Sequence, residues 1–141
     1  MFLLDTNVVS ESRKIAMGRA DSLVTAWNRR TSSQDAFLSV VTLMELELGV
    51  ARMERRDRSQ GRLLRRWLDD QVAPAFQDRI LEIDAAIARR CGSLHVPDRR
   101  SERDAWIAAT ALVHDFTIVT RNTADFEGTG VRLLNPWLPA P

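Results

Sequence analysis

The amino-acid sequence predicts an α/β fold in which a central parallel sheet of four to five strands is flanked by helices on both faces. Short apolar runs, too short to be helices, alternate with amphipathic helical patterns along the 141 residues. The apolar runs lack polar alternation, which is typical of strands buried on both faces. Strands that alternate with helices are joined by right-handed crossovers and therefore lie parallel in one sheet. We expect residues 1–141 to form one domain, because this length supports a single sizeable core.

The first elements follow from their apolar patterns and caps. Residues 1–4 are expected to form a strand, followed by a short helical turn over residues 8–12 and a loop with basic residues. Asp21 is a good N-cap for a helix that ends near Arg30. A turn then leads to a second buried strand over residues 36–41.

Two amphipathic helices are expected next. The pattern Thr42-x-x-Glu45 is a capping box and predicts a helix that begins at Thr42 and ends near Arg55. The second helix covers residues 58–72, with apolar residues on one side and arginines on the other. Pro74 is expected to end it, because a proline disfavours helical backbone at the residue before it.

The second half of the chain repeats the alternation of strands and helices. Residues 79–83 are a short strand candidate, and Asp84 is expected to cap a helix that ends near Leu94. After a loop, residues 101–114 form a strong helix whose alanines permit close packing. The last elements are expected to be a strand, a turn and a strand, at residues 117–120, 122–126 and 131–134.

The composition is that of an ordinary soluble domain, with 45% hydrophobic and 28% charged residues. The N-terminus has no signal-peptide pattern, and no apolar run approaches the roughly 20 residues that span a bilayer. We therefore expect a cytoplasmic protein without membrane contact. The single cysteine, Cys91, cannot form an internal disulfide and is expected to be a buried thiol in a helix.

The net charge of +1 differs from the basic balance of proteins that are held to nucleic acid chiefly by charge. Seven arginines nevertheless gather in one region. Arginine forks bind phosphate bidentately, so this region is a candidate phosphate-facing surface. The alternative interpretation is a solvated helical face. The seven residues are Arg52, Arg55, Arg56, Arg58, Arg62, Arg65 and Arg66.

Three carboxylates stand at junctions between strands and helices. Asp5 follows the first strand, Glu45 lies in the first turn of a helix, and Asp104 lies near the start of another helix. Because strand C-termini and helix N-termini share one edge of a parallel sheet, we expect these side chains to converge there. Asn122 or Asp125, which follow a later strand, would add a fourth polar group.

Carboxylates packed within a few ångströms cannot all stay ionised at neutral pH unless a cation offsets their repulsion. Oxygen ligands of this kind suit Mg²⁺ or Mn²⁺, which keep several waters and bind substrate phosphates. Such an ion activates water and stabilises negative charge on a reacting phosphate. The pattern therefore predicts a metal-dependent hydrolase that acts on phosphodiesters.

Each acid also has a purely structural interpretation, which spacing alone leaves open. Glu45 would serve only as a capping-box acid, and Asp104 would pair likewise with Ser101. Asp5 would cap the helical turn that follows it, and Asp125 would be an ordinary turn acid.

Five segments carry a more specific pattern: residues 1–10 with Asp5-Thr6-Asn7, residues 39–49 with Glu45, residues 104–111 with Asp104, residues 119–126, and Asn135-Pro136-Trp137. Together these segments resemble the PIN domain. More narrowly, they resemble the VapC toxins, including the FitB-like branch, of bacterial toxin–antitoxin systems. The motifs stand in the family's order and cover the chain from end to end, so their combination is specific although each motif alone is weak.

The resemblance implies roles for individual residues. Asp5 and Asp104 would be the principal Mg²⁺ ligands, with Mn²⁺ as a substitute. Glu45 would complete the acidic site. Thr6 and Asn7 would support the first carboxylate.

Thr120 and Asn122 would lie at the far wall of the site. Many relatives carry an aspartate where this chain has Asn122, so the chain departs from the family pattern by one negative charge. This departure places a second metal in doubt. Asp125 is a candidate to compensate for the missing charge.

The resemblance also implies protein partners. A VapB-like antitoxin would lay a helix and a tail along the toxin and push a basic side chain into the acidic pocket. Residues 43–53 and 58–68 carry apolar stripes that either anchor such a helix or belong to the core. The family typically forms homodimers, and Trp27, Trp67 or Trp137 are candidates for that interface.

The sequence thus predicts a magnesium-dependent endoribonuclease, the toxin of a type II toxin–antitoxin system. Asp5 and Asp104 would hold the metal, Glu45 would orient or deprotonate the attacking water, and arginines near the pocket would guide the RNA backbone. His95 and His114 lie outside the motifs and are expected to be incidental. Their position argues against a metal-independent mechanism with a histidine base.

Two other functions fit parts of the pattern. A PIN-fold binding protein with weak catalysis would use the acidic pocket to receive a basic peptide, and Asn122 favours this alternative. A phosphatase of the aspartyl-phosphate type also begins with a strand that ends in aspartate. That chemistry normally requires a second aspartate two residues later, where this chain has Asn7.

Overall fold

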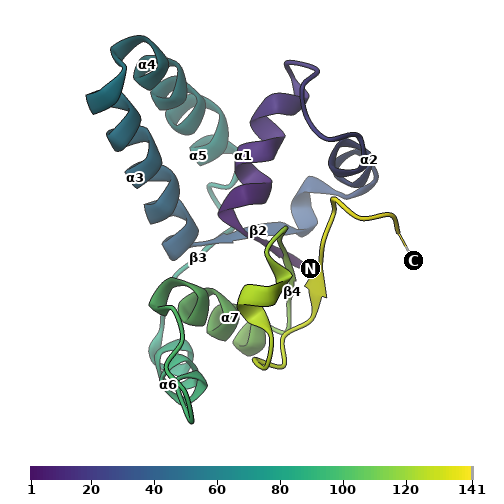
Figure 1. The fold of residues 1–141 in the computed structure, drawn as a ribbon, viewed down its shortest axis with the longest axis vertical. Coiled ribbons are helices and arrows are strands. Elements are labelled where there is room, and N and C mark those ends of the chain that lie inside the picture. The colour runs from purple at the N-terminus through teal and green to yellow at the C-terminus, as the bar shows by residue number, and fades with distance from the viewer. Residues whose placement is uncertain (141) are drawn as a thin grey trace.

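The protein contains a five-stranded parallel sheet, described by a computed structural model for residues 1–140 (Figure 1). The strand order is β3-β2-β1-β4-β5, so β1 is central, with Phe2 paired to Ala36 on one side and to Thr117 on the other. All four strand pairs are parallel, which confirms the predicted sheet. The strands are β1 (Phe2–Leu4), β2 (Ala36–Ser39), β3 (Ile80–Leu81), β4 (Thr117–Val119) and β5 (Leu133–Leu134).

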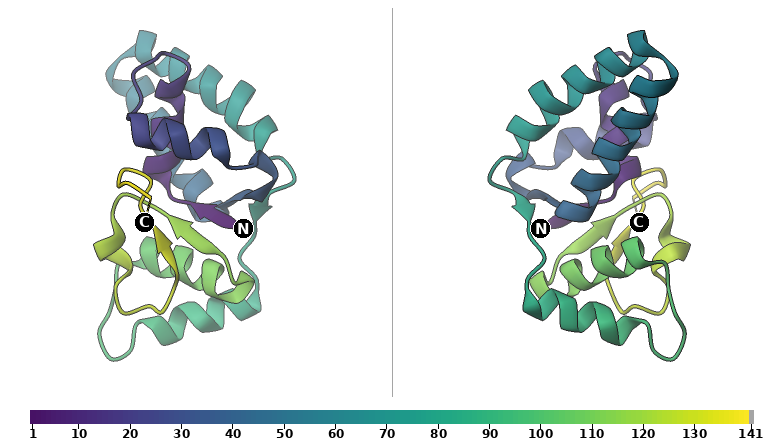
Figure 2. Two further views of the ribbon diagram at one scale, coloured as in Figure 1. Left: turned by 90° about the vertical axis from the view of Figure 1, so that its right-hand side faces the viewer. Right: turned by 90° about the vertical axis from the view of Figure 1, so that its left-hand side faces the viewer.

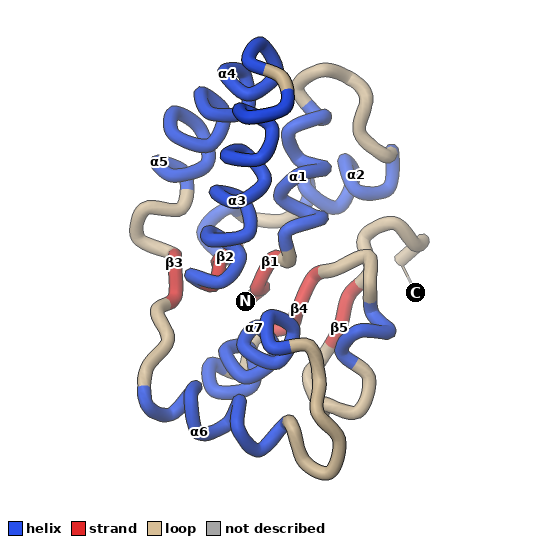
Figure 3. Tube along the Cα trace, turned by 60° about the vertical axis from the view of Figure 1, so that its left-hand side comes forward, coloured by secondary structure: helices blue, strands red, loops and turns tan. Residues whose placement is uncertain are grey.

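Helices cover both faces of the sheet, as predicted. Figure 2 shows helices α1 to α5 on one side of the strands and α6 and α7 on the other, and Figure 3 shows the strands between these two layers. The first layer contains α1 (Thr6–Ile15), α2 (Ser22–Arg30), α3 (Val40–Arg56), α4 (Arg58–Trp67), a π-helical turn (Leu68–Val72) and α5 (Ala73–Ala75). The second contains α6 (Ala85–Leu94) and α7 (Glu102–His114), and 3-10 turns cover Ser33–Asp35 and Thr123–Phe126.

Alternate strand residues enter two separate hydrophobic clusters. Leu4 and Val119 pack in the cluster under α1 to α5, whereas Leu3 and Ile118 pack in the cluster against α7. Leu3, Ile118 and Val119 are fully buried. The strands are therefore buried on both faces, which explains why their sequences are continuous apolar runs.

Helix α1 is longer than the sequence predicts. It begins at Thr6, immediately after Asp5, and includes Arg13 and Lys14, which were expected in a loop. The Asp5 carboxylate is the N-cap and accepts a hydrogen bond from the Thr6 N–H at 2.9 Å. The first turn contains β-branched and polar residues with weak helix propensity, so the cap and the burial of Val8 stabilise it.

Helix α3 begins two residues earlier than the predicted capping box. Its N-cap is Ser39, whose hydroxyl accepts a hydrogen bond from the Val41 N–H at 3.0 Å. Val40 and Val41, expected in the strand, form the first helical turn because pairing with β3 ends at Ser39. The Thr42 hydroxyl is buried and has no hydrogen-bond partner within residues 1–140. The prediction that Thr42 begins the helix is wrong.

The helical segment after α4 continues through Pro74, which was expected to end it. The π-helical turn Leu68–Val72 precedes the proline, and the Ala73 N–H donates to the Leu68 carbonyl. This wider turn changes the hydrogen-bond register before Pro74, whose nitrogen has no hydrogen to donate. The chain therefore passes the proline in helical conformation.

The tryptophans proposed for a dimer interface are largely part of this chain's own core. Trp27 is 4% exposed and Trp67 is 9% exposed, and both belong to the cluster under α1 to α5. Trp137 is half-buried against the same cluster. Trp27 and Trp67 are therefore not available to a second copy.

Other local predictions are confirmed. The Asp21 carboxylate accepts hydrogen bonds from the first turn of α2, and the Asp84 carboxylate accepts one from the Ile87 N–H in α6. Cys91 is a buried free thiol in α6. Among residues 1–140, no helix is both long enough and apolar enough to cross a membrane.

The close contact between α3 and α4 gives a test of the packing. A Cβ atom at Gly61 would lie 2.8 Å from the backbone nitrogen of Glu54, closer than real Cβ atoms approach. We expect Gly61→Ala to lower the free energy of unfolding by about 1–3 kcal/mol, because overpacking outweighs the gain in helix propensity. Urea denaturation measures this change.

Gly49→Ala is the matched control, because Gly49 is also a helical glycine but a Cβ there would meet nothing within 4 Å. We expect this substitution to raise the free energy of unfolding by roughly 0.5–1 kcal/mol. Equal effects of the two substitutions would contradict the tight helix contact at Gly61.

Candidate functional site

Asp5 stands at the carboxyl end of the central strand and is only 8% exposed. Its Oδ1 accepts a hydrogen bond from the Thr6 N–H. Its Oδ2 accepts one from the Thr120 hydroxyl at 2.8 Å and one from the Asn7 amide at 3.4 Å. A carboxylate has about four acceptor positions, so these three donors orient Asp5 and leave one position for a further donor or a cation.

Asn7 and Thr120 connect the start of α1 to the loop after β4. The Asn7 amide donates to the Thr120 hydroxyl at 3.2 Å, and the Asn7 Oδ1 accepts from the Arg121 N–H at 3.1 Å. The fully buried Thr120 hydroxyl also accepts from the Asn122 N–H at 3.0 Å. The Thr120 hydroxyl therefore donates one hydrogen bond and accepts two, which is its full capacity, and it holds Asp5 in one orientation.

Glu45 reaches this site from α3. The Thr6 hydroxyl donates to Glu45 Oε1 at 3.0 Å, and the Arg103 Nη1 lies 3.8 Å from Glu45 Oε2. Burial is the largest cause that raises the pKa of Glu45, and repulsion from Asp5 adds to it. The Thr6 hydrogen bond and the Arg103 charge act in the opposite direction. Glu45 thus belongs to the site rather than to a capping box.

Asp104 enters the site from the first turn of α7. The pKa of Asp104 is raised to about 6, and burial is the largest cause. Neighbouring negative charges raise it further: those of Asp125, Asp5 and Glu45. The Ser101 hydroxyl favours the charged form but does not cap the helix. The acids that are distant in the sequence therefore repel one another at one edge of the sheet.

The donor set fits a hard divalent cation. Asp5, Glu45 and Asp104 offer carboxylate oxygens, and the pKa of Asp104 is raised first by burial and then by neighbouring carboxylates, whose repulsion a cation would offset. Within residues 1–140, no three His, Cys, Asp or Glu side chains are close enough to enclose a metal by themselves.

Asn122 and Asp125, the candidates for a fourth polar group beside the three carboxylates, are both exposed. Asn122 is bound to the site through its backbone N–H, which donates to Thr120. Asp125 lies in the 3-10 turn Thr123–Phe126, close enough for its charge to raise the pKa of Asp104. Asp125 is therefore electrostatically part of the site.

His114 lies away from Asp104, as expected. It ends α7, ten residues after Asp104, which is about 15 Å along a helix. The His95 Nδ1 accepts a hydrogen bond from the Arg100 N–H in the loop before α7. His95 is thus bound to the backbone of its own loop.

The arginine cluster lies on α3 and α4, and its members at the turn between these helices are remote from the acids. Arg56 follows Glu45 by 11 residues on α3, which is about 16 Å along the helix, and Figure 1 shows the turn between α3 and α4 at the end away from the sheet. Arg65 pairs with protein carboxylates, at 2.6 Å to Glu47 and 2.9 Å to Glu54. Arg65 is thus neutralised by carboxylates of this chain, and the phosphate-facing role of the other arginines in the cluster stays a prediction.

The profile of the PIN domain family matches residues 2–130 of the chain. The chain belongs to the PIN domain family. This match covers the strands up to β4 and each of the acids described above.

Similar proteins share nearly the whole length of this PIN domain. It is 37% identical to VapC ribonuclease Y4jK of Sinorhizobium fredii, over 99% of this chain and 100% of that protein. It is 34% identical to Toxin FitB of Neisseria gonorrhoeae, over 97% of this chain and 99% of that protein. A solved structure of FitAB bound to an IR36 DNA fragment superposes with a TM-score of 0.89 and 31% identity, covering 100% of this chain and 99% of that one.

Two arginines beside the acids of this PIN domain were missed by sequence reasoning. Arg103 directly precedes Asp104 and faces Glu45, and Arg121 stands between Thr120 and the loop that follows. In the sequence, only their position next to a motif residue, Asp104 or Thr120, indicates that these arginines lie near the site. Such adjacency is less conspicuous than the clustering of arginines elsewhere in the chain. The Arg103 guanidinium lies beside Glu45, whereas Arg121 is bound to the site through its backbone N–H, which donates to Asn7.

The raised pKa of Asp104 has a consequence for stability. The folded protein holds this proton up to a pH of about 6, against 3.8 for an ordinary aspartate, so ionisation destabilises the fold as pH rises from about 4 to 6. We expect Asp104→Asn to raise the free energy of unfolding at pH 7.5 by about 1 kcal/mol, a value reduced because the group is partly exposed. Urea denaturation in EDTA measures the difference.

At pH 3.5 the two proteins are expected to have nearly the same stability, because Asp104 is then mostly protonated in both the folded and the unfolded chain. Mg²⁺ should stabilise the wild type more than the Asp104→Asn variant. A constant difference between the two proteins from pH 3.5 to pH 7.5 would contradict the raised pKa of Asp104.

Proposed function

We propose that this PIN domain is a magnesium-dependent endoribonuclease that hydrolyses RNA phosphodiester bonds and acts as the toxin of a toxin–antitoxin pair. The observation that carries the proposal is the convergence of the Asp5, Glu45 and Asp104 carboxylates at one edge of the sheet, where burial and then repulsion from neighbouring acids raise the pKa of Asp104 to about 6. Such a set of oxygens is unfavourable without a cation. The names of the two relatives, a ribonuclease and a toxin, support the same conclusion.

Asp5 and Asp104 would hold Mg²⁺, and Mn²⁺ would substitute for it. When bound, the ion activates water and stabilises charge on the phosphate. The Thr120 hydroxyl, the Asn7 amide and the Thr6 N–H hold the Asp5 carboxylate in place before substrate binds. This preorganisation avoids a cost of reorientation during the reaction.

Glu45 would orient the attacking water and accept its proton. The raised pKa of Glu45 makes it a better base than an ordinary carboxylate at neutral pH. The Thr6 hydroxyl binds Glu45 Oε1 and leaves Oε2 towards Arg103. The water oxygen attacks phosphorus while one phosphodiester P–O bond breaks.

The exposed Asn122 leaves fewer negative charges at the site, which favours one metal rather than two. Asp125, through its charge, would partly compensate for Asn122. These assignments concern supporting residues and do not change the roles of the three principal acids.

The proposed partner is a VapB-like antitoxin that places a basic side chain in the acidic pocket. The FitAB structure, in which a similar chain is part of a complex, supports a protein partner, and the basic side chain in the pocket stays a prediction. A homodimer is also proposed, with Trp137 as the one tryptophan of the three that is not fully committed to the core.

Cleavage of a fluorescent single-stranded RNA tests the nuclease. We expect internal cuts in Mg²⁺ or Mn²⁺ and none in EDTA, and we expect Asp104→Asn and Glu45→Gln to reduce the rate by at least about 100-fold. Denaturing electrophoresis of the products and initial rates measure both effects. Asp125→Asn should reduce the rate several-fold if its charge contributes.

Asp115→Asn is the matched control, because Asp115 is an aspartate at the other end of α7, paired with Arg132. It should retain the wild-type rate. Metal-independent cuts, or full activity in Asp104→Asn, would contradict the proposed mechanism. RNA left intact under all conditions would favour the alternative of a binding protein.

A further inference from the structure

The side chain of Arg121 has no protein partner for its charge, although it stands beside an acidic site. Within residues 1–140, its guanidinium forms no ion pair and donates no hydrogen bond, and its closest described contact is the ring of Trp137. Exposed arginines such as Arg89 share this property, whereas other arginines are bound by the protein: Arg65 by carboxylates, Arg79 and Arg100 by backbone carbonyls, and Arg132 by Asp115. What distinguishes Arg121 is that its backbone is bound to the acidic site and its guanidinium lies at an aromatic ring.

The backbone of Arg121 is tied to the acidic site. Its N–H donates to Asn7 Oδ1 at 3.1 Å, and the amide of the same Asn7 donates to Asp5 and to Thr120. Two hydrogen bonds thus connect Arg121 to the Asp5 carboxylate. The residue cannot move away from the site without breaking this connection.

The Asn135-Pro136-Trp137 segment holds Arg121 from the other side. The Asn135 amide donates to the Arg121 carbonyl at 3.4 Å, and Asn135 Oδ1 accepts from the Trp137 N–H at 2.9 Å. The Trp137 ring then lies 5.3 Å from the Arg121 Cζ. This short segment is neither a strand nor a helix. It orients both the backbone and the guanidinium of Arg121.

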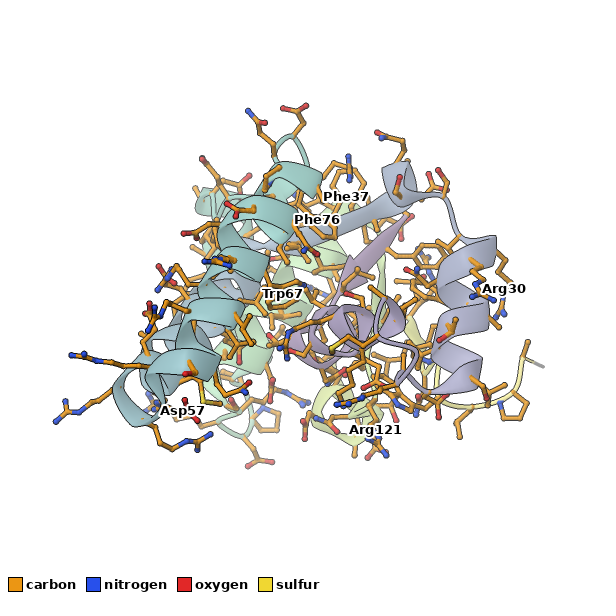
Figure 4. All side chains as sticks on the ribbon, turned by 90° about the horizontal axis from the view of Figure 1, so that it is seen from above. Arg30, Phe37, Asp57, Trp67, Phe76 and Arg121 are labelled. Atoms are coloured by element: carbon orange, nitrogen blue, oxygen red, sulfur yellow. The ribbon has the colours of Figure 1, made fainter. Side chains whose placement is uncertain are left out.

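A guanidinium that stacks on an aromatic ring keeps its N–H donors free at its edge. Arg121 is exposed, and Figure 4 shows it at the margin of the molecule. Its planar fork matches the two oxygens of a phosphate. The arrangement is that of a preorganised phosphate-binding group whose partner lies outside this chain.

We propose that Arg121, positioned by Asn135 and Trp137, binds a phosphate of single-stranded RNA adjacent to the bond that is cut. This inference rests on the proposed ribonuclease function and names the residue that aligns the substrate. The hydrogen bonds through Asn7 hold the backbone of Arg121 near Asp5, so a strand bound at the acids passes within reach of the Arg121 side chain. Arg121 binds the strand, and Trp137 is a positioning residue.

Fluorescence anisotropy with a labelled single-stranded RNA in EDTA tests this inference without cleavage. We expect Arg121→Ala to weaken RNA binding roughly 5- to 10-fold at low salt, because one charge-assisted contact is lost. The slope of log K against log salt should become shallower by about 0.7, the value for one phosphate contact on a single strand. In Mg²⁺, KM for RNA should rise while kcat stays within about twofold, because the contact exists before and during the reaction.

Arg89→Ala is the matched control, because Arg89 is an exposed arginine on α6 and carries the same charge. It should leave the salt slope unchanged. Trp137→Ala should weaken binding as Arg121→Ala does, and Trp137→Phe should restore it, because phenylalanine also offers a ring face to the guanidinium. A structural defect would instead lower the melting temperature without rescue by phenylalanine.

The two proposals fail in different ways. RNA binding that depends on Arg121 without cleavage in Mg²⁺ would contradict the nuclease and support the phosphate contact. Metal-dependent cleavage with the same salt slope in Arg121→Ala and in the wild type would overturn the phosphate contact and leave the nuclease in place. Absence of single-stranded RNA binding by the wild type would also overturn the contact.

Discussion

The burial of the Asp5 carboxylate at the end of the central strand is the constraint on which the site depends. An unpaired buried ion costs several kcal/mol, and three hydrogen bonds from Thr6, Asn7 and Thr120 offset that cost. The Thr120 bond is possible only because β4 lies beside β1 in the sheet. The strand order therefore determines which side chains stabilise the first acid.

The other two acids, Glu45 and Asp104, are also partly buried, and their pKa values are raised. Glu45 arrives on α3 and Asp104 on α7, from opposite faces of the sheet, and each is partly removed from water. Thr6 and Arg103 offset some of the repulsion at Glu45, whereas Asp104 keeps the larger rise in pKa. The fold thus retains an unfavourable concentration of negative charge, which is how proteins commonly hold sites for cations.

Helix caps that act within their own helix were predicted well from the sequence. Helix starts that depend on other elements of the fold were not. The Asp21 and Asp84 caps act within one turn of their own helix, so their residues alone reveal them. The start of α3 depends instead on where pairing with β3 ends, which made Ser39 the cap rather than Thr42. The passage of the helix through Pro74 likewise depends on a π-helical turn that no propensity indicates.

The sequence by itself determined the parallel α/β class and the residues that carry the acids, because apolar periodicity and strand-to-helix junctions are local patterns. Only the tertiary structure decided that Thr120 binds Asp5 across 115 positions of sequence, that Arg65 is bound by Glu47 and Glu54, and that the backbone of Arg121 is bound by Asn7. These outcomes depend on strand order and helix direction, since segments far apart in the chain meet only after the sheet has formed.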